Sequence, residues 1–182
     1  MILRWPGPTS NAGPPRGRVD ESHVVELRDI FPTFLDVAGA MGSVPKNHTL
    51  QGASLLPLIF GDDNDDDDDD DEGNKKKNWR PWIDLEHSTC YNVTNHWNAL
   101  TDGMIKYIFN AFSATEQLFN LTVDPYELQD LSSNASFASE LAKWRLRLVE
   151  QFEREKRGQE WVKDGKLQRR TEGQVYSPNY PT

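Results

Sequence analysis

The chain has one cysteine, no long apolar run and no excess of basic residues, and each shortage excludes a class of protein. Cys90 is the only cysteine, so no internal disulfide can form. No apolar run reaches the roughly 18 residues of a membrane-spanning helix, and the apolar stretch at residues 1–6 is too short for a signal peptide. The net charge of −9 leaves no basic face to neutralise phosphates, so we expect no nucleic-acid partner.

The negative charge is concentrated in residues 62–78, which hold ten acidic residues and three lysines. A run of aspartates repels itself and cannot be buried, so this segment is predicted to be a disordered insertion or linker. It lacks the spaced ligands, the central glycine and the closing glutamate of an EF-hand loop. We therefore expect no metal site in this segment.

Four Asn-x-Ser/Thr sequons are present, where average composition would give roughly one by chance. The candidate glycosylation sites are Asn47, Asn92, Asn120 and Asn134. Together they indicate a protein of the secretory pathway, either secreted or lysosomal. A coincidence in an Asn-rich chain is the alternative explanation.

An antiparallel sheet is predicted in the second half of the chain. Its four strands are expected at residues 80–87, 97–101, 105–109 and 116–121. Asp102-Gly103 lies between two alternating runs, which favours a hairpin with a type I′ turn and positive φ at both central positions. Asp124-Pro125 begins a further turn, because proline fixes φ and aspartate can bond its own backbone.

A long amphipathic helix is predicted from about Asn134 to Arg157, with Gly158 as its stop. Its apolar positions recur at spacings of three and four: Phe137, Leu141, Trp144, Leu148 and Phe152. Beyond it, Asp164-Gly165 predicts a second, short hairpin that could add an edge strand.

A shorter helix is predicted between Asp29, a good N-cap residue, and Gly39, a natural residue just past a helix end. Apolar side chains four positions apart, such as Ile30 and Phe34, form one wide face. A face of this width indicates that a sheet packs against the helix.

The order of these pieces resembles the arylsulfatase-type sulfatases of the alkaline-phosphatase-like superfamily. The matching stretches are residues 2–8, 29–39, 51–59, 97–103, 106–109, 116–121 and 124–128. Each stretch alone would be a weak signal, whereas their order and spacing match the family. The resemblance covers residues 1–9, 24–60 and 79 to about 168.

The resemblance implies an α/β fold class, present here as an α+β fragment. Residues 1–61 would be the end of a sulfatase catalytic α/β domain, and residues 62–78 the linker. Residues 79–170 would form the C-terminal subdomain, an antiparallel four-stranded sheet packed by one long helix, followed by a tail at 171–182. Because Met1 falls within an expected strand, a truncated chain is predicted.

The function implied is hydrolysis of a sulfate ester on a small molecule or glycan, by a formylglycine and a calcium ion. The formylglycine arises from a Cys or Ser in a Cys-x-Pro-Ser-Arg or related motif, whereas Cys90 is followed by Tyr91-Asn92-Val93-Thr94. We therefore assign no catalytic residue and no metal ligand to this chain, and expect calcium only in the full-length protein. No oligomeric state is indicated.

Three residues are candidates for substrate contact. Glu86-His87 matches a Glu-His pair that faces the active-site mouth in related enzymes, and His96 could line the same mouth. A capping or turn histidine at a strand end is the structural alternative for His87. The alternatives for the whole chain are a non-catalytic, sulfatase-derived glycoprotein or carbohydrate-binding module, and an inactive truncated fragment.

Overall fold

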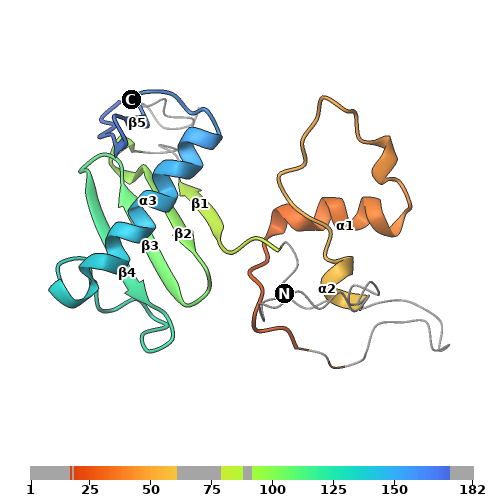
Figure 1. Ribbon diagram of the computed structural model, residues 1–182, viewed down its shortest axis with the longest axis horizontal. Helices are drawn as coiled ribbons and strands as arrows, with labels where there is room; N and C mark the ends of the chain where they lie inside the picture. The colour runs from red at the N-terminus through yellow and green to blue at the C-terminus, as the bar shows by residue number, and fades with distance from the viewer. Residues whose placement is uncertain (1–16, 18, 61–78, 88–91, 173–182) are drawn as a thin grey trace, which may run out of the picture. The chain divides into compact units, whose positions relative to one another are not determined.

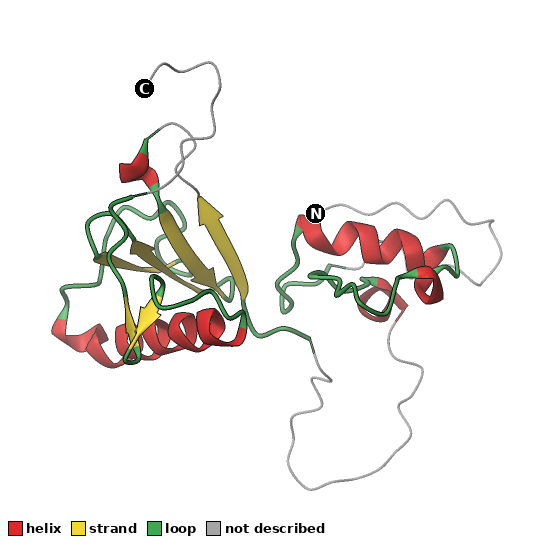
Figure 2. Ribbon diagram, turned by 90° about the horizontal axis from the view of Figure 1, so that it is seen from above, coloured by secondary structure: helices red, strands yellow, loops and turns green. Residues whose placement is uncertain are grey.

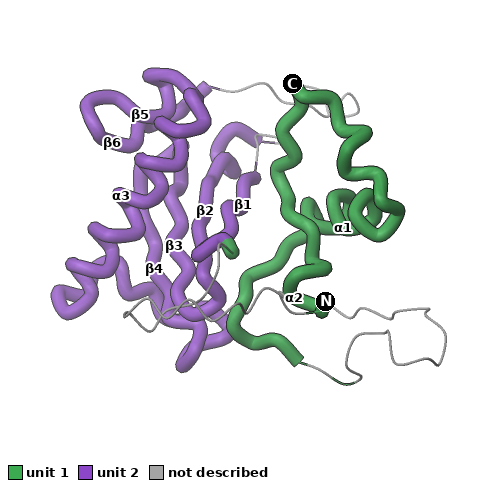
Figure 3. Tube along the Cα trace, turned by 45° about the vertical axis from the view of Figure 1, so that its right-hand side comes forward, with its two compact units in different colours: residues 1–79 green, residues 80–182 purple. Residues whose placement is uncertain are grey.

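The structure, a computed structural model, describes residues 17, 19–60, 79–87 and 92–172. The chain divides into two compact units, residues 1–79 and 80–182 (Figure 3). The expected strand within residues 2–8, the Asp-rich segment, Cys90 and the tail after residue 172 lie outside the described residues. None of the helices in the described ranges is long and apolar enough to cross a membrane.

The first unit is built from short helices (Figure 1). Their bounds are η1 Leu27–Asp29, α1 Ile30–Val37, η2 Met41–Ser43 and α2 Leu56–Phe60. Helix α1 begins directly after Asp29, as predicted, but the Asp29 carboxylate does not cap the helix itself. Its Oδ2 accepts a hydrogen bond from the Glu26 amide at 2.8 Å, and its Oδ1 accepts one from the Ala53 amide at 2.9 Å.

The end of α1 follows the prediction at Gly39. This glycine has φ +65°, a left-handed conformation that glycine adopts without a steric penalty. Its amide donates to the Asp36 carbonyl, and the Ala40 amide donates to the Leu35 carbonyl. This pair of bonds is a Schellman motif, which satisfies the last carbonyl groups of the helix.

Residues 52–55 pack closely on the start of α1. The Thr33 hydroxyl donates to the Asp29 carbonyl and accepts from the Leu55 amide, at 2.6 and 3.0 Å. A Cβ atom at Gly52 would lie 2.0 Å from the Arg28 carbonyl oxygen, so only glycine fits at this position. The buried carboxylate of Asp29 and the hydroxyl of Thr33 therefore fix residues 52–55, which lie more than twenty residues away in the sequence.

The second unit is an antiparallel meander covered by one long helix, which confirms the predicted fold (Figures 1 and 2). The strands are β1 Ile83–His87, β2 Trp97–Thr101, β3 Ile105–Asn110 and β4 Thr115–Asn120, and their order in the sheet is their order in the chain. The register places Leu100 beside Tyr107 and Tyr107 beside Leu118. These three residues, together with Phe109, form the sheet side of the core.

Helix α3, Ala138–Arg154, supplies the other side of this core, preceded by the one-turn helix η4, Ala135–Phe137. The predicted apolar stripe is confirmed, because Leu141, Trp144, Leu148 and Phe152 are all buried in the core cluster. The predicted stop at Gly158 is displaced. The left-handed residue that ends the helix is Lys156, at φ 56°, and the Arg157 amide donates to the Phe152 carbonyl.

Both Asp-Gly pairs form hairpins, but with different turns. At the first, only Gly103 has positive φ, because Asp102 Oδ1 accepts hydrogen bonds from the amides of Met104 and Ile105 and so precedes the turn. The type I′ turn predicted there is wrong. Asp164 and Gly165 do have positive φ at both positions, and they join β5 Val162–Lys163 to β6 Lys166–Leu167. This hairpin is a sheet of two strands and does not extend the meander.

Candidate functional site

The three expected substrate contacts lie where β1 and β2 pair, but on both faces of the sheet. Glu86 pairs with Asn98, and His87 pairs with Trp97. Since successive side chains of a strand point to opposite faces, Glu86 and His87 diverge. His96 precedes β2, two positions before Asn98, and lies on the face of Glu86. The structure therefore brings Glu86 and His96 together and sets His87 apart from them.

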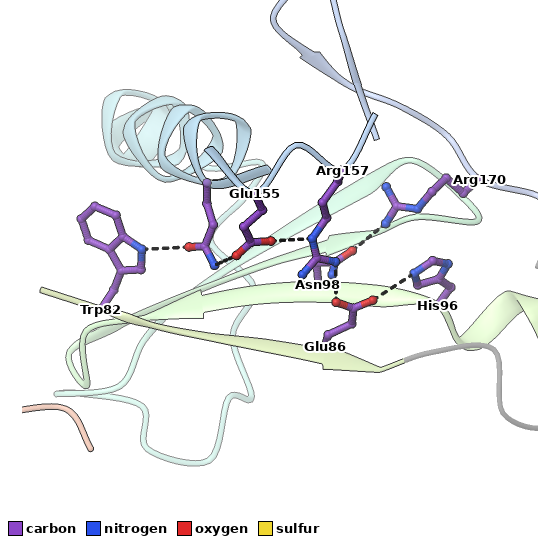
Figure 4. A network of polar contacts seen from close by, with 8 residues as sticks. Trp82, Glu86, His96, Asn98, Glu155, Arg157 and Arg170 are labelled. Atoms are coloured by element: carbon purple, nitrogen blue, oxygen red, sulfur yellow. Dashed lines mark hydrogen bonds and ion pairs between the residues drawn. The ribbon is translucent and has the colours of Figure 1, made fainter. Parts of the chain in front are cut away.

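Glu86 belongs to a chain of polar contacts that runs to the helix (Figure 4). Arg157 Nη1 donates to Glu86 Oε2 at 2.6 Å, and Arg157 Nε donates to Glu155 Oε2 at 2.5 Å. Gln151 continues the chain by donating to Glu155 and accepting from the Trp82 indole. Burial opposes the charge of Arg157, but the bonds to the two glutamates raise its pKa. In this geometry Glu86 and Glu155 are the anions that balance Arg157.

His96 is inside the unit, with 8% of its surface exposed. Its ring lies edge-on to Trp161, with centroids 5.5 Å apart, and Nε2 is 3.9 Å from Glu86 Oε1. That separation exceeds hydrogen-bonding distance, and neither ring nitrogen has a hydrogen-bond partner. Burial lowers the His96 pKa, and the nearby Arg170 guanidinium lowers it further. The residue is therefore a neutral, buried imidazole.

Arg170 was not predicted as a site residue from the sequence, yet it is central to the group formed with Asn98, His96 and Trp161. It is 7% exposed, its Nη2 donates to Asn98 Oδ1 at 2.6 Å, and its guanidinium carbon lies 3.8 Å from the Trp161 ring centroid. Stacking on an indole stabilises a cation that has lost its hydration. Burial nevertheless lowers the Arg170 pKa to about 10. The sequence Gln168-Arg169-Arg170 does not indicate that Arg170 is buried, because the position of this residue depends on the path of the chain after β6.

His87 is half-buried and lies on the face of the sheet opposite to α3. Its ring stacks on Trp97, with centroids 5.8 Å apart and planes inclined by 20°. Its Nδ1 lies 3.0 Å from the Asn95 carbonyl oxygen. A carbonyl only accepts, so Nδ1 carries the proton, and Nε2 of the neutral ring is an acceptor. His87 would donate through Nε2 only as an imidazolium.

No group of three or more His, Cys, Asp or Glu side chains that could hold a metal ion occurs among the described residues. The remaining charged side chains of the sheet are paired instead. Lys106 has Nζ 2.8 Å from both oxygens of Glu127. Glu116 accepts bonds from Tyr107 and Arg145, all at 2.6 Å. The carboxylates of Glu116 and Glu127 are therefore engaged in ion pairs within the subdomain.

Three of the four sequon asparagines share one local geometry. Each side-chain oxygen accepts a hydrogen bond from the backbone amide two residues on, at Asn92, Asn120 and Asn134. Asn92, Asn134 and also Asn47 are exposed, whereas Asn120 is half-buried at the end of β4. All four thus lie within the described residues, and they differ in accessibility.

The comparisons with known proteins agree with this fold. No protein-family model matches the chain. Arylsulfatase K of Homo sapiens is 36% identical over 136 residues, which cover 69% of this chain and 21% of that protein. An arylsulfatase of Clostridium perfringens is 31% identical over 143 residues, covering 79% of this chain and 25% of that protein. The chain thus spans about a fifth to a quarter of the length of these relatives.

Solved structures show the same similarity. A 2-O GAG sulfatase superposes with a TM-score of 0.58 at 24% identity, over 74% of this chain and 26% of that one. A protein solved with its substrate D-glucosamine-2-N,6-O-disulfate gives a TM-score of 0.55 at 23% identity, over 71% and 24% of the two chains. At these identities the superpositions establish the fold, and the sequence relatives establish the kinship. The chain belongs to the arylsulfatase-type sulfatases and corresponds to their C-terminal portion.

Proposed function

We propose that the protein containing this chain is a sulfuric ester hydrolase. The observation that carries the proposal is the 36% identity to an arylsulfatase over 136 residues. The nucleophile and the calcium ligands of the family would come from residues outside this sequence, because Cys90 lacks the required motif and the described residues contain no metal cluster. Residues 1–182 would supply the end of the catalytic domain, the Asp-rich linker and the C-terminal subdomain.

A sulfated glycan is the proposed substrate class. Two structural neighbours are described as a 2-O GAG sulfatase and as a complex with a disulfated glucosamine. The proposed contact is His87, whose ring forms a flat aromatic pair with Trp97. Such a pair offers a surface for the apolar face of a sugar ring, and an imidazolium would also attract a sulfate group. Glu86 and His96 would not contact the substrate themselves. They would stabilise the packing of β1 against the rest of the subdomain.

The setting we propose is a secretory or lysosomal compartment. Four sequons support it, since N-glycosylation occurs only on chains that enter the secretory pathway. The same setting suits a protein that acts on extracellular or lysosomal sulfated glycans.

Activity of the intact protein tests the proposal. The protein that contains residues 1–182 would be purified from a secretory host and assayed with 4-methylumbelliferyl sulfate, the matching phosphate and a sulfated disaccharide. We expect sulfate release that chelation abolishes and calcium restores. No release from either sulfate substrate by the intact, calcium-loaded protein would refute the assignment.

His87→Ala tests the proposed substrate contact in the same assay. We expect KM for the disaccharide to rise while the aryl sulfate is affected less, because only the glycan is large enough to span the aromatic pair. His48→Ala is the matched control, since His48 is an exposed histidine of the first unit. Unchanged KM values for both variants would exclude His87 from the substrate site.

A further inference from the structure

A surface hollow beside the end of β4 has two sequon asparagines in its wall. Its volume is about 230 Å³, and it contains Asn120, Asn134 and the apolar side chains Val123, Leu131 and Phe137. Asn120 is the last residue of β4, and Asn134 is the N-cap of η4. The loop between β4 and η4 folds back, so the side chains of Asn120 and Asn134 both line the hollow.

The loop that follows β4 carries three strongly exposed apolar side chains. Val123, Tyr126 and Leu128 are 79%, 82% and 84% exposed. Clustered exposed apolar side chains mark a surface that another group covers. Because Val123 lines the hollow together with Asn120 and Asn134, a glycan attached to the chain itself is a suitable cover.

The exposure of Asn134 favours modification there, and its local geometry is the one shared with Asn92 and Asn120. Its Oδ1 accepts a hydrogen bond from the Ser136 amide at 3.0 Å, which holds the oxygen end of the side-chain amide against the backbone. The nitrogen end is directed away from that turn. Residues 134–136 are all exposed, so the whole sequon lies on the surface.

The geometry at Asn120 disfavours modification. This residue is half-buried and pairs with Ile105 in the sheet. Its Oδ1 accepts bonds from both the amide and the hydroxyl of Thr122. A glycan at this position would have to leave from within the hollow, next to the ladder of β3 and β4.

We propose that Asn134 carries an N-linked glycan whose first N-acetylglucosamine covers the hollow and contacts Val123 and Phe137, while Asn120 stays unmodified. The inference rests on the secretory setting proposed above.

The co-reactant is a lipid-linked oligosaccharide diphosphate. Asn134 Nδ2 forms a bond to the anomeric carbon, the bond from that carbon to the diphosphate oxygen breaks, the lipid diphosphate leaves with the electron pair, and Nδ2 loses one proton.

Site-specific mass analysis of the intact protein from a secretory host tests the modification. Peptide N-glycosidase in heavy-oxygen water converts each modified asparagine to a labelled aspartate. We expect label at Asn134 and none at Asn120. Label at Asn47 or Asn92 but not at Asn134 would overturn this inference and leave the secretory setting intact. No label at any sequon would overturn both.

Thermal unfolding tests where the first sugar lies. An endoglycosidase that leaves one N-acetylglucosamine should preserve the Tm of the glycosylated protein, whereas complete removal should lower it by a few degrees. Complete enzymatic removal converts the side chain of Asn134 to that of an aspartate, which is an equally good N-cap, so the cap is not lost. Equal Tm values for the trimmed and the fully deglycosylated protein would overturn the contact with the hollow.

A matched pair of variants completes the test. Val123→Ser removes one apolar wall and should abolish the Tm difference between the trimmed and the fully deglycosylated protein. Val19→Ser changes a similarly exposed valine of the first unit, 76% exposed, and should leave the difference unchanged. A difference that persists in Val123→Ser would show that the sugar does not contact this wall.

Discussion

Arg157 Nη1 donates to Glu86 Oε2 at 2.6 Å, and this ion pair joins β1 to the segment after α3 across 71 positions of the sequence. The side chains are 22% and 32% exposed, so water screens the pair only in part. The pair fixes the edge strand of the meander to the element that covers its core.

We expect Glu86→Gln to lower the free energy of unfolding by about 1–2 kcal/mol, the range for a partly screened hydrogen bond between charged groups. Arg157→Met also removes the bond to Glu155, so it should have a larger effect, and the double variant should lose no more than Arg157→Met alone. Urea unfolding of the three variants measures this coupling. Losses that simply add would mean that Glu86 and Arg157 do not stabilise each other.

His96→Phe should leave stability at about pH 7.5 unchanged or improved, because it removes two buried nitrogens that have no partner. The folded pKa of His96 is lowered from 6.5 by burial and by Arg170. The unfolded state therefore binds the proton more readily, and the wild-type chain should lose stability as the pH falls below about 6.5.

The charged groups around His96 are Arg170, Arg157 and Glu86, with a smaller Coulombic contribution from His87 on the other face of the sheet, and the phenylalanine variant leaves all four in place. Thermal melts at about pH 5 and about pH 7.5 should thus give a smaller pH-dependent loss for His96→Phe than for the wild type. An identical loss in both proteins would show that His96 does not titrate in this way.

Glu116→Gln should make the free energy of unfolding less dependent on pH in the acid range. Burial alone would raise the Glu116 pKa, but hydrogen bonds from Arg145 and Tyr107 lower it below 4.5. The stabilisation is fully present above the unfolded pKa and is lost as the pH falls through the lower folded value. Urea midpoints measured from about pH 6 to about pH 3 should decline less steeply in the variant. A decline as steep as that of the wild type would contradict the prediction.

Gly52→Ala should destabilise the first unit severely. Its Cβ would lie 2.0 Å from the Arg28 carbonyl oxygen and 2.3 Å from the carbonyl carbon, both of them backbone atoms that cannot turn aside. Forced overpacking of this kind costs at least about 1–3 kcal/mol. Gly42→Ala is the control, since nothing lies within 4 Å of its Cβ. Limited proteolysis between residues 20 and 60 should be faster in Gly52→Ala alone.

Local patterns account for most of the second unit. Alternation placed the four strands, and the spacing from Leu141 to Phe152 placed the helix, because both patterns follow directly from backbone geometry. The register then follows from the need to bury Leu100, Tyr107 and Leu118 on one face. These elements were predictable because each is encoded by residues close together in the sequence.

The candidate site was less predictable from the sequence, because its residues come from segments that are far apart in the chain. Arg170 reaches Asn98 across 72 positions, and no local pattern marks it. His96 looked available for substrate by its place near a strand end, but the packing of Trp161 against it decides its burial. At Asp102, a side chain that bonds two following amides moved the turn by one residue, which an Asp-Gly pair alone does not reveal.

The meander has a further consequence for how the subdomain folds. Every neighbouring pair of its strands is also consecutive in the chain, so each pairing closes only a short loop. Low separation between contacting residues is associated with fast folding. The strands can therefore pair one after another in the order of synthesis, and α3, which is made after all four strands, closes over a sheet that has already formed.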